Sequence, residues 1–197
     1  MFCSIANVAA FLQVAIAEDH EPYAEQAIRA ATAAIQAYCE QRIERVEEDE
    51  IALDGYGGSI LFLPELPATA VSEVVENGVT LTAGADYVLG QHGMLHRSRG
   101  PWARGVQNIQ VTYTHGYSPI PDQIVSVCTR AAAREYQAGL RAAEMGGVAG
   151  VQATSLGDYS VQYGGEQSAY REGQMGASGA PILLRSEKEA LARYRVR

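Results

Sequence analysis

The hydrophobic periodicity of this chain changes twice, and no other feature restricts its fold as strongly. In residues 4–40 apolar side chains recur about every three to four positions, as they do on one face of a helix. Residues 51–117 instead hold short β-type runs separated by Gly and Asn, and the helical period returns in residues 121–143. A β-rich segment is therefore inserted between helical segments, which predicts an α+β fold.

Local start signals delimit three helices that we expect to form a small bundle. Ser4 is a favourable N-cap for the first helix, because its hydroxyl can accept a hydrogen bond from an unpaired backbone N–H. Glu21-Pro22 begins the second helix and Pro121-Asp122 the third, since Pro is well tolerated at the first helical position. The bundle is predicted to comprise residues 1–45 and 118–145.

The inserted β-domain is predicted to span residues 46–117 as an antiparallel meander. Asn77-Gly78 is a strong hairpin signal, because both central positions of a type I′ turn need positive φ. His92-Gly93 is a second, weaker signal. Alternation along the last strand predicts one buried face and one solvated or partner-facing face. The candidate strands are residues 60–63, 71–76, 79–82, 87–89, 94–97 and 106–114.

The C-terminal quarter combines a glycine-rich stretch with a basic end. Residues 146–181 contain nine glycines, which predicts a flexible, extended arm, and residues 182–197 are expected to end the chain in a short helix. Residues 182–197 hold five basic and two acidic side chains and carry a net charge of +3. Because the whole chain carries −8, the rest of the chain carries −11. We call this end the docking segment and expect it to bind an acidic partner surface. Its candidate docking residues are Leu184, Arg185, Lys188, Leu191, Arg193, Tyr194, Arg195 and Arg197.

The charge balance argues against a broad nucleic-acid-binding face. The chain has a net charge of −8 and a pI near 5.0, whereas phosphate binding relies on Lys and Arg. An acidic wall is nevertheless compatible with a channel through which duplex DNA slides without specific binding. One dense cluster of carboxylates, here called the acidic run, is either a solvated face or an acidic wall of a channel or subunit contact. Its members are Glu44, Glu47, Glu48, Asp49 and Glu50.

No pattern indicates a catalytic centre, a cofactor or a metal site. Cys3, Cys39 and Cys128 form no CxxC pair, and we expect them to be reduced, mostly buried thiols. His92 and His96 flank a predicted turn and are interpreted as ordinary loop histidines.

Two further features bear on partners. Trp102 is a candidate interface anchor, and the alternative is that it caps the core of the β-domain. The longest apolar stretch, residues 6–17, is too short to span a membrane, and no basic residue precedes it as in a signal peptide. We therefore expect synthesis in the cytoplasm and no membrane partner.

The order of these signals resembles the head-to-tail adaptor (connector) proteins of tailed bacteriophages and phage-like gene transfer particles. The most specific part is the run at residues 109–117, followed closely by Pro121-Asp122 and a helix. The resemblance covers nearly the whole chain and is weakest in the glycine-rich stretch. The other matching pieces are Ala37-Tyr38-Cys39, residues 61–67, residues 74–78, Gly93-Met94-Leu95, Trp102 and residues 191–195.

The resemblance implies a non-catalytic virion subunit made in the cytoplasm of a host bacterium. Adaptors of this kind form a ring, commonly twelve-fold, beneath the portal protein, where the ring extends the DNA channel. They present an attachment surface for stopper or other tail-completion proteins. The implied partners of this chain are its own copies, the portal protein and a tail-side protein.

Three alternatives stay open at this point. Another connector component, such as a stopper or tail-terminator, is the nearest, although the helix-rich ends argue against it. A small enzyme could use His92, His96 or His115 together with the acidic run, and would need a pocket where these groups converge. A DNA-binding regulator would need a basic recognition helix, and residues 122–144 mix basic and acidic side chains.

Overall fold

The computed structural model describes residues 1–144, 153–156, 159–162 and 181–196. Its contacts divide the chain into two compact units, each with its own interior. The helical unit comprises Met1–Tyr38 and the described part of Asp122–Ala192. The β unit comprises Cys39–Pro121 and the described part of Arg193–Arg197. Most of the glycine-rich arm predicted for residues 146–181 lies outside the described residues.

Three helices in the helical unit follow the predicted order. They are α1 (Ile5–Leu12), α2 (Glu21–Cys39) and α3 (Asp122–Glu144), and a short 3-10 turn, Glu18–His20, precedes α2. The Ser4 cap is confirmed: its Oγ accepts a hydrogen bond from the backbone N–H of Asn7, whose side chain in turn accepts from the Ser4 N–H. The first helix ends after Leu12, because Gln13 adopts a left-handed conformation.

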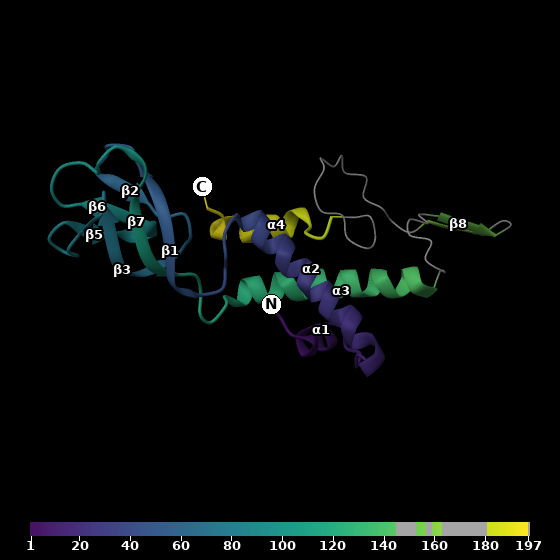
Figure 1. Ribbon diagram of the computed structural model, residues 1–197. Helices are drawn as coiled ribbons and strands as arrows, with labels where there is room; N and C mark the ends of the chain where they lie inside the picture. The colour runs from purple at the N-terminus through teal and green to yellow at the C-terminus, as the bar shows by residue number, and fades with distance from the viewer. Residues whose placement is uncertain (145–152, 157–158, 163–180, 197) are drawn as a thin grey trace. The chain divides into compact units, whose positions relative to one another are not determined.

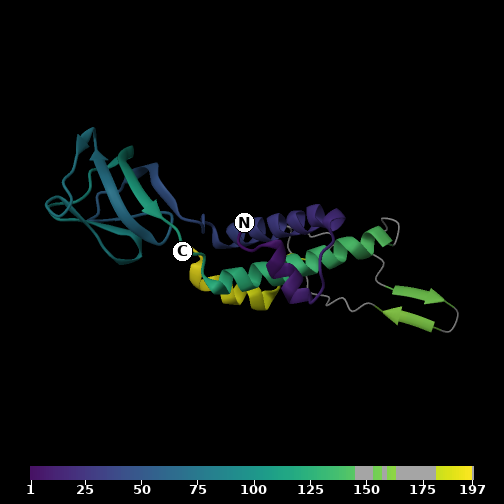
Figure 2. The same cartoon turned by 90° about the horizontal axis from the view of Figure 1, so that it is seen from below.

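Many of the buried positions in α2 and α3 are alanines. The buried positions of α2 include Ala24, Ala27 and Ala31, and those of α3 include Ala131 and Ala132. Figures 1 and 2 both show α1 beside the long helix α3. The Thr32 hydroxyl of α2 lies 3.7 Å from the Cys128 sulfur of α3. Alanine loses no side-chain conformational entropy on burial, so these positions are buried at little conformational cost.

The predicted C-terminal helix is present as α4 (Arg185–Leu191), which is followed by the 3-10 turn Ala192–Tyr194. α4 lies alongside α3 within the helical unit (Figure 2). Strand β9 (Tyr159–Gln162) pairs antiparallel with β8 (Ala153–Leu156). None of the described helices is long and apolar enough to cross a lipid bilayer.

The β unit contains two antiparallel sheets, so the α+β class is confirmed. One sheet has the strand order β1-β7-β3-β4 and the other β2-β6-β5. The Asn77-Gly78 hairpin is confirmed between β3 and β4, with φ of 52° and 79° at its two central residues. The strands are β1 (Val46–Gly55), β2 (Ile60–Phe62), β3 (Ala68–Glu76), β4 (Val79–Thr80), β5 (Tyr87–Leu89), β6 (Met94–Arg97) and β7 (Gly105–His115).

Two features of the β unit differ from the prediction. The strands do not form a meander, because β7 pairs with both β1 and β3, and β2 pairs with β6. Such pairings join residues far apart in the chain, and no local signal encodes them. Strand β1 was also not predicted, because its acidic residues have low β propensity.

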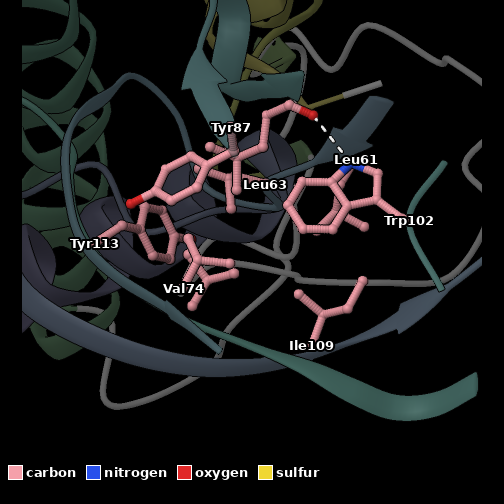
Figure 3. Close-up of a cluster of buried hydrophobic side chains, with 9 residues drawn as sticks. Leu61, Leu63, Val74, Tyr87, Trp102, Ile109 and Tyr113 are labelled. Carbon is pink, nitrogen blue, oxygen red and sulfur yellow. Dashed lines mark hydrogen bonds between the residues drawn. The ribbon is translucent and has the colours of Figure 1, made fainter. Parts of the chain in front are cut away.

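The inner faces of both sheets share one hydrophobic core. Ile109, Val111 and Tyr113 of β7 are buried, as their alternation predicted. The indole N–H of Trp102 donates to the carbonyl oxygen of Leu95 at 3.3 Å, drawn as the dashed line in Figure 3. The cluster consists of Leu61, Leu63, Val74, Tyr87, Leu95, Trp102, Ile109, Val111 and Tyr113.

Candidate functional site

The first part of the docking segment packs on its own chain through a partly buried ion pair. The Arg134 guanidinium donates to both carboxylate oxygens of Glu187, at 2.8 and 2.6 Å, and to the Ile182 carbonyl oxygen at 3.0 Å. Glu187 also accepts from the Leu184 backbone N–H at 3.0 Å, at the start of α4. Leu191, four residues after Glu187 in α4, is fully buried. One side of α4 therefore belongs to the interior of the helical unit.

The opposite side of α4 is exposed and basic. Leu184 is 41% exposed, and Lys188 is also exposed. The Arg185 side chain is 94% exposed and pairs with Glu189 one turn later, at 3.1 Å. α4 therefore presents a basic surface with an apolar side chain, while its inward side is held by Arg134.

The last part of the docking segment lies within the β unit. Tyr194 is buried, and its carbonyl oxygen accepts from the Gln41 side-chain amide at 2.6 Å. The Arg193 guanidinium lies 5.1 Å from the centre of the Tyr194 ring, and Arg195 forms an ion pair with Glu40. Arg197 lies outside the described residues. Leu191 and Tyr194 are thus core residues of their own units.

The acidic run lies on and just before β1, which is an edge strand of the four-stranded sheet. Glu44, Glu47 and Glu50 are exposed. Glu48, in a left-handed conformation at an irregular point of the β1–β7 pairing, accepts from the Ser72 hydroxyl at 2.7 Å. Charges on an edge strand discourage uncontrolled strand pairing. Asp49 is different, because it points to a buried partner.

That buried partner is His115, which is 0% exposed. Its Nε2 lies 3.1 Å from an Asp49 carboxylate oxygen. Its Nδ1 lies 3.4 Å from a Glu65 carboxylate oxygen without forming a hydrogen bond. The structure does not bring the other two histidines of the enzyme hypothesis to this site, because His92 lies in a turn and His96 is exposed on β6. A fully buried His115 offers no surface to a substrate.

Other predicted residues also have definite places. Trp102 is 1% exposed, so the core interpretation fits it and it offers a partner no surface. The three cysteines are confirmed as free and buried. Among the residues that the structure describes, no group of three His, Cys, Asp or Glu side chains could hold a metal ion.

Sequence reasoning missed an apolar surface on the three-stranded sheet. Ile60, Phe62 and Val88 are 39%, 66% and 50% exposed, and Met94 is partly exposed. The strand register pairs Phe62 with Met94 and places both Ile60 and Val88 opposite His96, so these residues share one side of the sheet. We call this surface the outer apolar face. The available signal was the uninterrupted apolar run at residues 60–63, which is apolar on both faces of its strand.

Comparison with known proteins assigns a family. The model of the head completion protein family matches residues 1–130. No curated protein matches the chain significantly. Three solved structures of a gene transfer agent (GTA) particle contain similar chains, and the family assignment does not depend on them.

The structural similarities have the following values. The neck of the empty GTA particle, computed with C6 symmetry, has a chain with 16% identity and a TM-score of 0.48, covering 90% of this chain and 80% of that one. The neck of the native particle, computed with C12 symmetry, gives 15% identity, a TM-score of 0.49, and coverage of 98% and 90%. The native GTA virion gives 15% identity, a TM-score of 0.49, and coverage of 92% and 80%.

Proposed function

The chain belongs to the head completion protein family, a family of head-to-tail connector proteins, and from this premise we propose that it is the adaptor subunit beneath the portal. In this role its copies form a ring that extends the DNA channel and carries the stopper or another tail-completion protein. The subunit acts by binding and positioning its neighbours and not by catalysis. It is made in the cytoplasm of the host bacterium and functions in the particle.

The observation that carries portal binding is the two-sided character of α4. Its inward side is held by the Arg134–Glu187 pair, while Leu184, Arg185 and Lys188 face outward. A surface held in position before binding loses less conformational entropy on association than a mobile arm does. We therefore assign portal docking to these exposed residues of α4. Leu191 and Tyr194 act indirectly, by packing the segment on its own chain.

The proposed ring also needs contacts between copies. The outer apolar face is suited to burial against a neighbouring copy, because exposed apolar patches commonly mark interaction sites. The exposed members of the acidic run are assigned to the channel wall or to the subunit boundary; they are Glu44, Glu47, Glu48 and Glu50. A carboxylate-lined wall would repel DNA phosphates and let the duplex pass without specific binding.

The alternative is another component of the head-to-tail connector, a stopper or tail-terminator, which would contact the tail side and not the portal. The helical unit favours the adaptor, since it supplies the exposed α4 surface. The two alternatives differ in one measurable property, namely direct binding to the portal.

The decisive experiment exchanges the charge of the α4 surface. In the double variant Arg185→Glu, Lys188→Glu, binding to purified cognate portal should fall at least about tenfold, because two attractive charges become repulsive. A particle-producing strain complemented with this variant should accumulate filled heads without tails. Deletion of residues 182–197 is a poorer test, because it would also remove the buried Leu191 and Glu187.

The matched control is Arg99→Glu, Arg104→Glu, which makes the same charge change at exposed positions of the β unit. The control should bind portal as the unaltered protein does. Undiminished portal binding by the α4 variant would overturn the assignment of α4. If the unaltered protein itself fails to bind portal but binds a tail protein, the stopper alternative takes its place.

A further inference from the structure

Two of the three cysteines form a buried thiol pair that joins the start of the chain to α3. The Sγ atoms of Cys3 and Cys128 lie 3.3 Å apart, although 125 positions separate the two residues in the sequence. Both thiols are buried, and Cys3 is 8% exposed while Cys128 is 0% exposed. A disulfide has an S–S distance of about 2.05 Å, so its formation would require the two atoms to approach by only about 1.2 Å.

From this juxtaposition we propose that Cys3 and Cys128 are a modification site, at which a peroxide oxidant forms an intrachain disulfide. No metal site competes for these thiols, because the described residues include no third suitable ligand beside them. The pair is also distinct from the surfaces assigned to portal and subunit contacts above.

The surroundings support Cys3 as the reacting thiol. When Cys3 ionises, the Cys128 thiol donates a hydrogen bond to it, and this bond lowers the pKa of Cys3 to about 7. The same bond, together with burial, raises the pKa of Cys128. Thiolates and not thiols react with peroxides, so the first oxidation is expected at Cys3.

The chemistry balances with hydrogen peroxide as the oxidant. The Cys3 thiolate attacks one peroxide oxygen, the O–O bond breaks, and hydroxide leaves while Cys3 becomes a sulfenic acid. The Cys128 sulfur then attacks the Cys3 sulfur, and the S–O bond breaks with release of a second hydroxide equivalent. The two thiol protons convert these equivalents into two waters. The two electrons lost by the sulfurs have reduced the peroxide.

The remaining cysteine provides an internal control. Cys39 is fully buried, and burial raises its pKa to about 11, so it holds little thiolate near neutral pH. Cys39 should therefore survive an oxidant dose that converts the pair. The first residues are the point of access, because Met1 and Ser4 on either side of Phe2-Cys3 are exposed.

A disulfide at this site would close a loop of 125 residues and fix the first residues to α3. Cross-linking a long loop restricts the unfolded chain, so the thermal midpoint of the helical unit should rise by roughly 5 °C or more. If the proposed function holds, the released particle meets a more oxidising medium than the cytoplasm, and the link would form there. That timing rests on the proposed function, but the disulfide itself does not.

The test oxidises the full chain with hydrogen peroxide and compares it with Cys3→Ala, Cys128→Ala and Cys39→Ala variants. After unfolding, the unaltered protein and Cys39→Ala should each have lost two reactive thiols and about 2 Da, and a digest should contain the Cys3–Cys128 linked peptide. Cys128→Ala should gain oxygen at Cys3 instead, whereas Cys3→Ala should keep both of its remaining thiols, because Cys39 and Cys128 are fully buried and their pKa values are raised. Circular dichroism should verify that both variants fold. Dithiothreitol should restore both thiols and the original mass in the two disulfide-forming proteins.

Several results would overturn the proposal whether or not the protein is an adaptor. They are oxygen addition without a linked peptide in the unaltered protein, a link that includes Cys39, and links between separate chains only. Failure to bind portal would leave this result unchanged, so the two hypotheses can fail independently.

Discussion

Arg134 and Glu187 form a two-bond ion pair that fastens α4 to α3, with the Glu187 side chain only 4% exposed. Arg134→Ala would leave the carboxylate buried without its cation. We expect the free energy of unfolding of the helical unit to fall by about 2–4 kcal/mol. Urea titration followed by far-ultraviolet circular dichroism measures this change. Arg130→Ala, an exposed position one turn earlier in α3, should change it by less than about 0.5 kcal/mol, and equal effects of the two variants would contradict the expectation.

The buried His115 gives a second prediction, for the β unit. It separates the carboxylates of Asp49 and Glu65, and its ring lies 5.0 Å from the Tyr113 ring. His115→Ala would create a cavity and let two carboxylates face each other, so a loss of about 2–4 kcal/mol is expected. Fluorescence of Trp102, the only tryptophan, reports this unfolding. The exposed His96 is the control: His96→Ala should unfold at nearly the same urea concentration as the unaltered protein.

Much of the local structure could be predicted because its signals are local. The Ser4 cap, the Asn77-Gly78 hairpin and the start of α3 each depend on a few neighbouring residues. Strand β1 could not be predicted, because its pairing partner β7 lies about sixty positions away and overrides its low β propensity.

The candidate sites were less predictable, for a physical reason. An amphipathic segment has the same pattern whether its apolar side packs on its own chain or on a partner, so the burial of Leu191 and Tyr194 was not evident. The outer apolar face and the Cys3–Cys128 pair depend on strand register and helix packing, which periodicity alone does not specify.

The outer apolar face supports a prediction on assembly. Phe62→Thr, Val88→Thr keeps β-favouring residues but removes much of the exposed apolar area, so the proposed ring should weaken by about tenfold or more. Electron microscopy of portal-bound protein and sedimentation of the assembly measure it. Val79→Thr, at an exposed valine of the β3–β4 hairpin, is the control. A double variant that assembles as well as this control would rule out the face as a subunit contact.

Cys39 leads to a prediction on alkaline stability. Burial raises its pKa to about 11, so the folded state holds the thiol proton more tightly than the unfolded state does. The contribution of the protonated Cys39 thiol to the free energy of unfolding is fully present below its unfolded pKa near 9. This contribution is lost as the pH rises to about 11. The unaltered protein should therefore lose about 2–3 kcal/mol more than Cys39→Ala between pH 9 and 11. Urea titrations followed by Trp102 fluorescence measure the free energy of unfolding of both proteins between pH 9 and 11. If the two proteins lose the same amount of stability over this pH range, the prediction is wrong.

Gly116 is a position where one added methyl group should lower the stability of the β unit. It has a φ of +83° at the end of β7, and its N–H donates to the Pro67 carbonyl oxygen at 3.1 Å. A Cβ at this site would lie 2.3 Å from the Glu44 carbonyl oxygen and 2.7 Å from its carbon, so the backbone would have to move. Gly116→Ala therefore combines an unfavourable φ with a steric clash, and we expect it to destabilise the β unit by about 2–4 kcal/mol or more.

Gly139 is the matched control, because it tests the same substitution without the clash. It lies inside α3, and a Cβ there would meet nothing within 4 Å. Gly139→Ala should stabilise the helical unit by up to about 1 kcal/mol, since alanine restricts the unfolded chain and favours the helix. Urea titrations, read by Trp102 fluorescence for Gly116→Ala and by helical circular dichroism for Gly139→Ala, should thus shift in opposite directions. A Gly116→Ala protein with unaltered stability would mean that the turn after β7 can relax away from Glu44, and the close approach of these two segments would no longer explain the glycine.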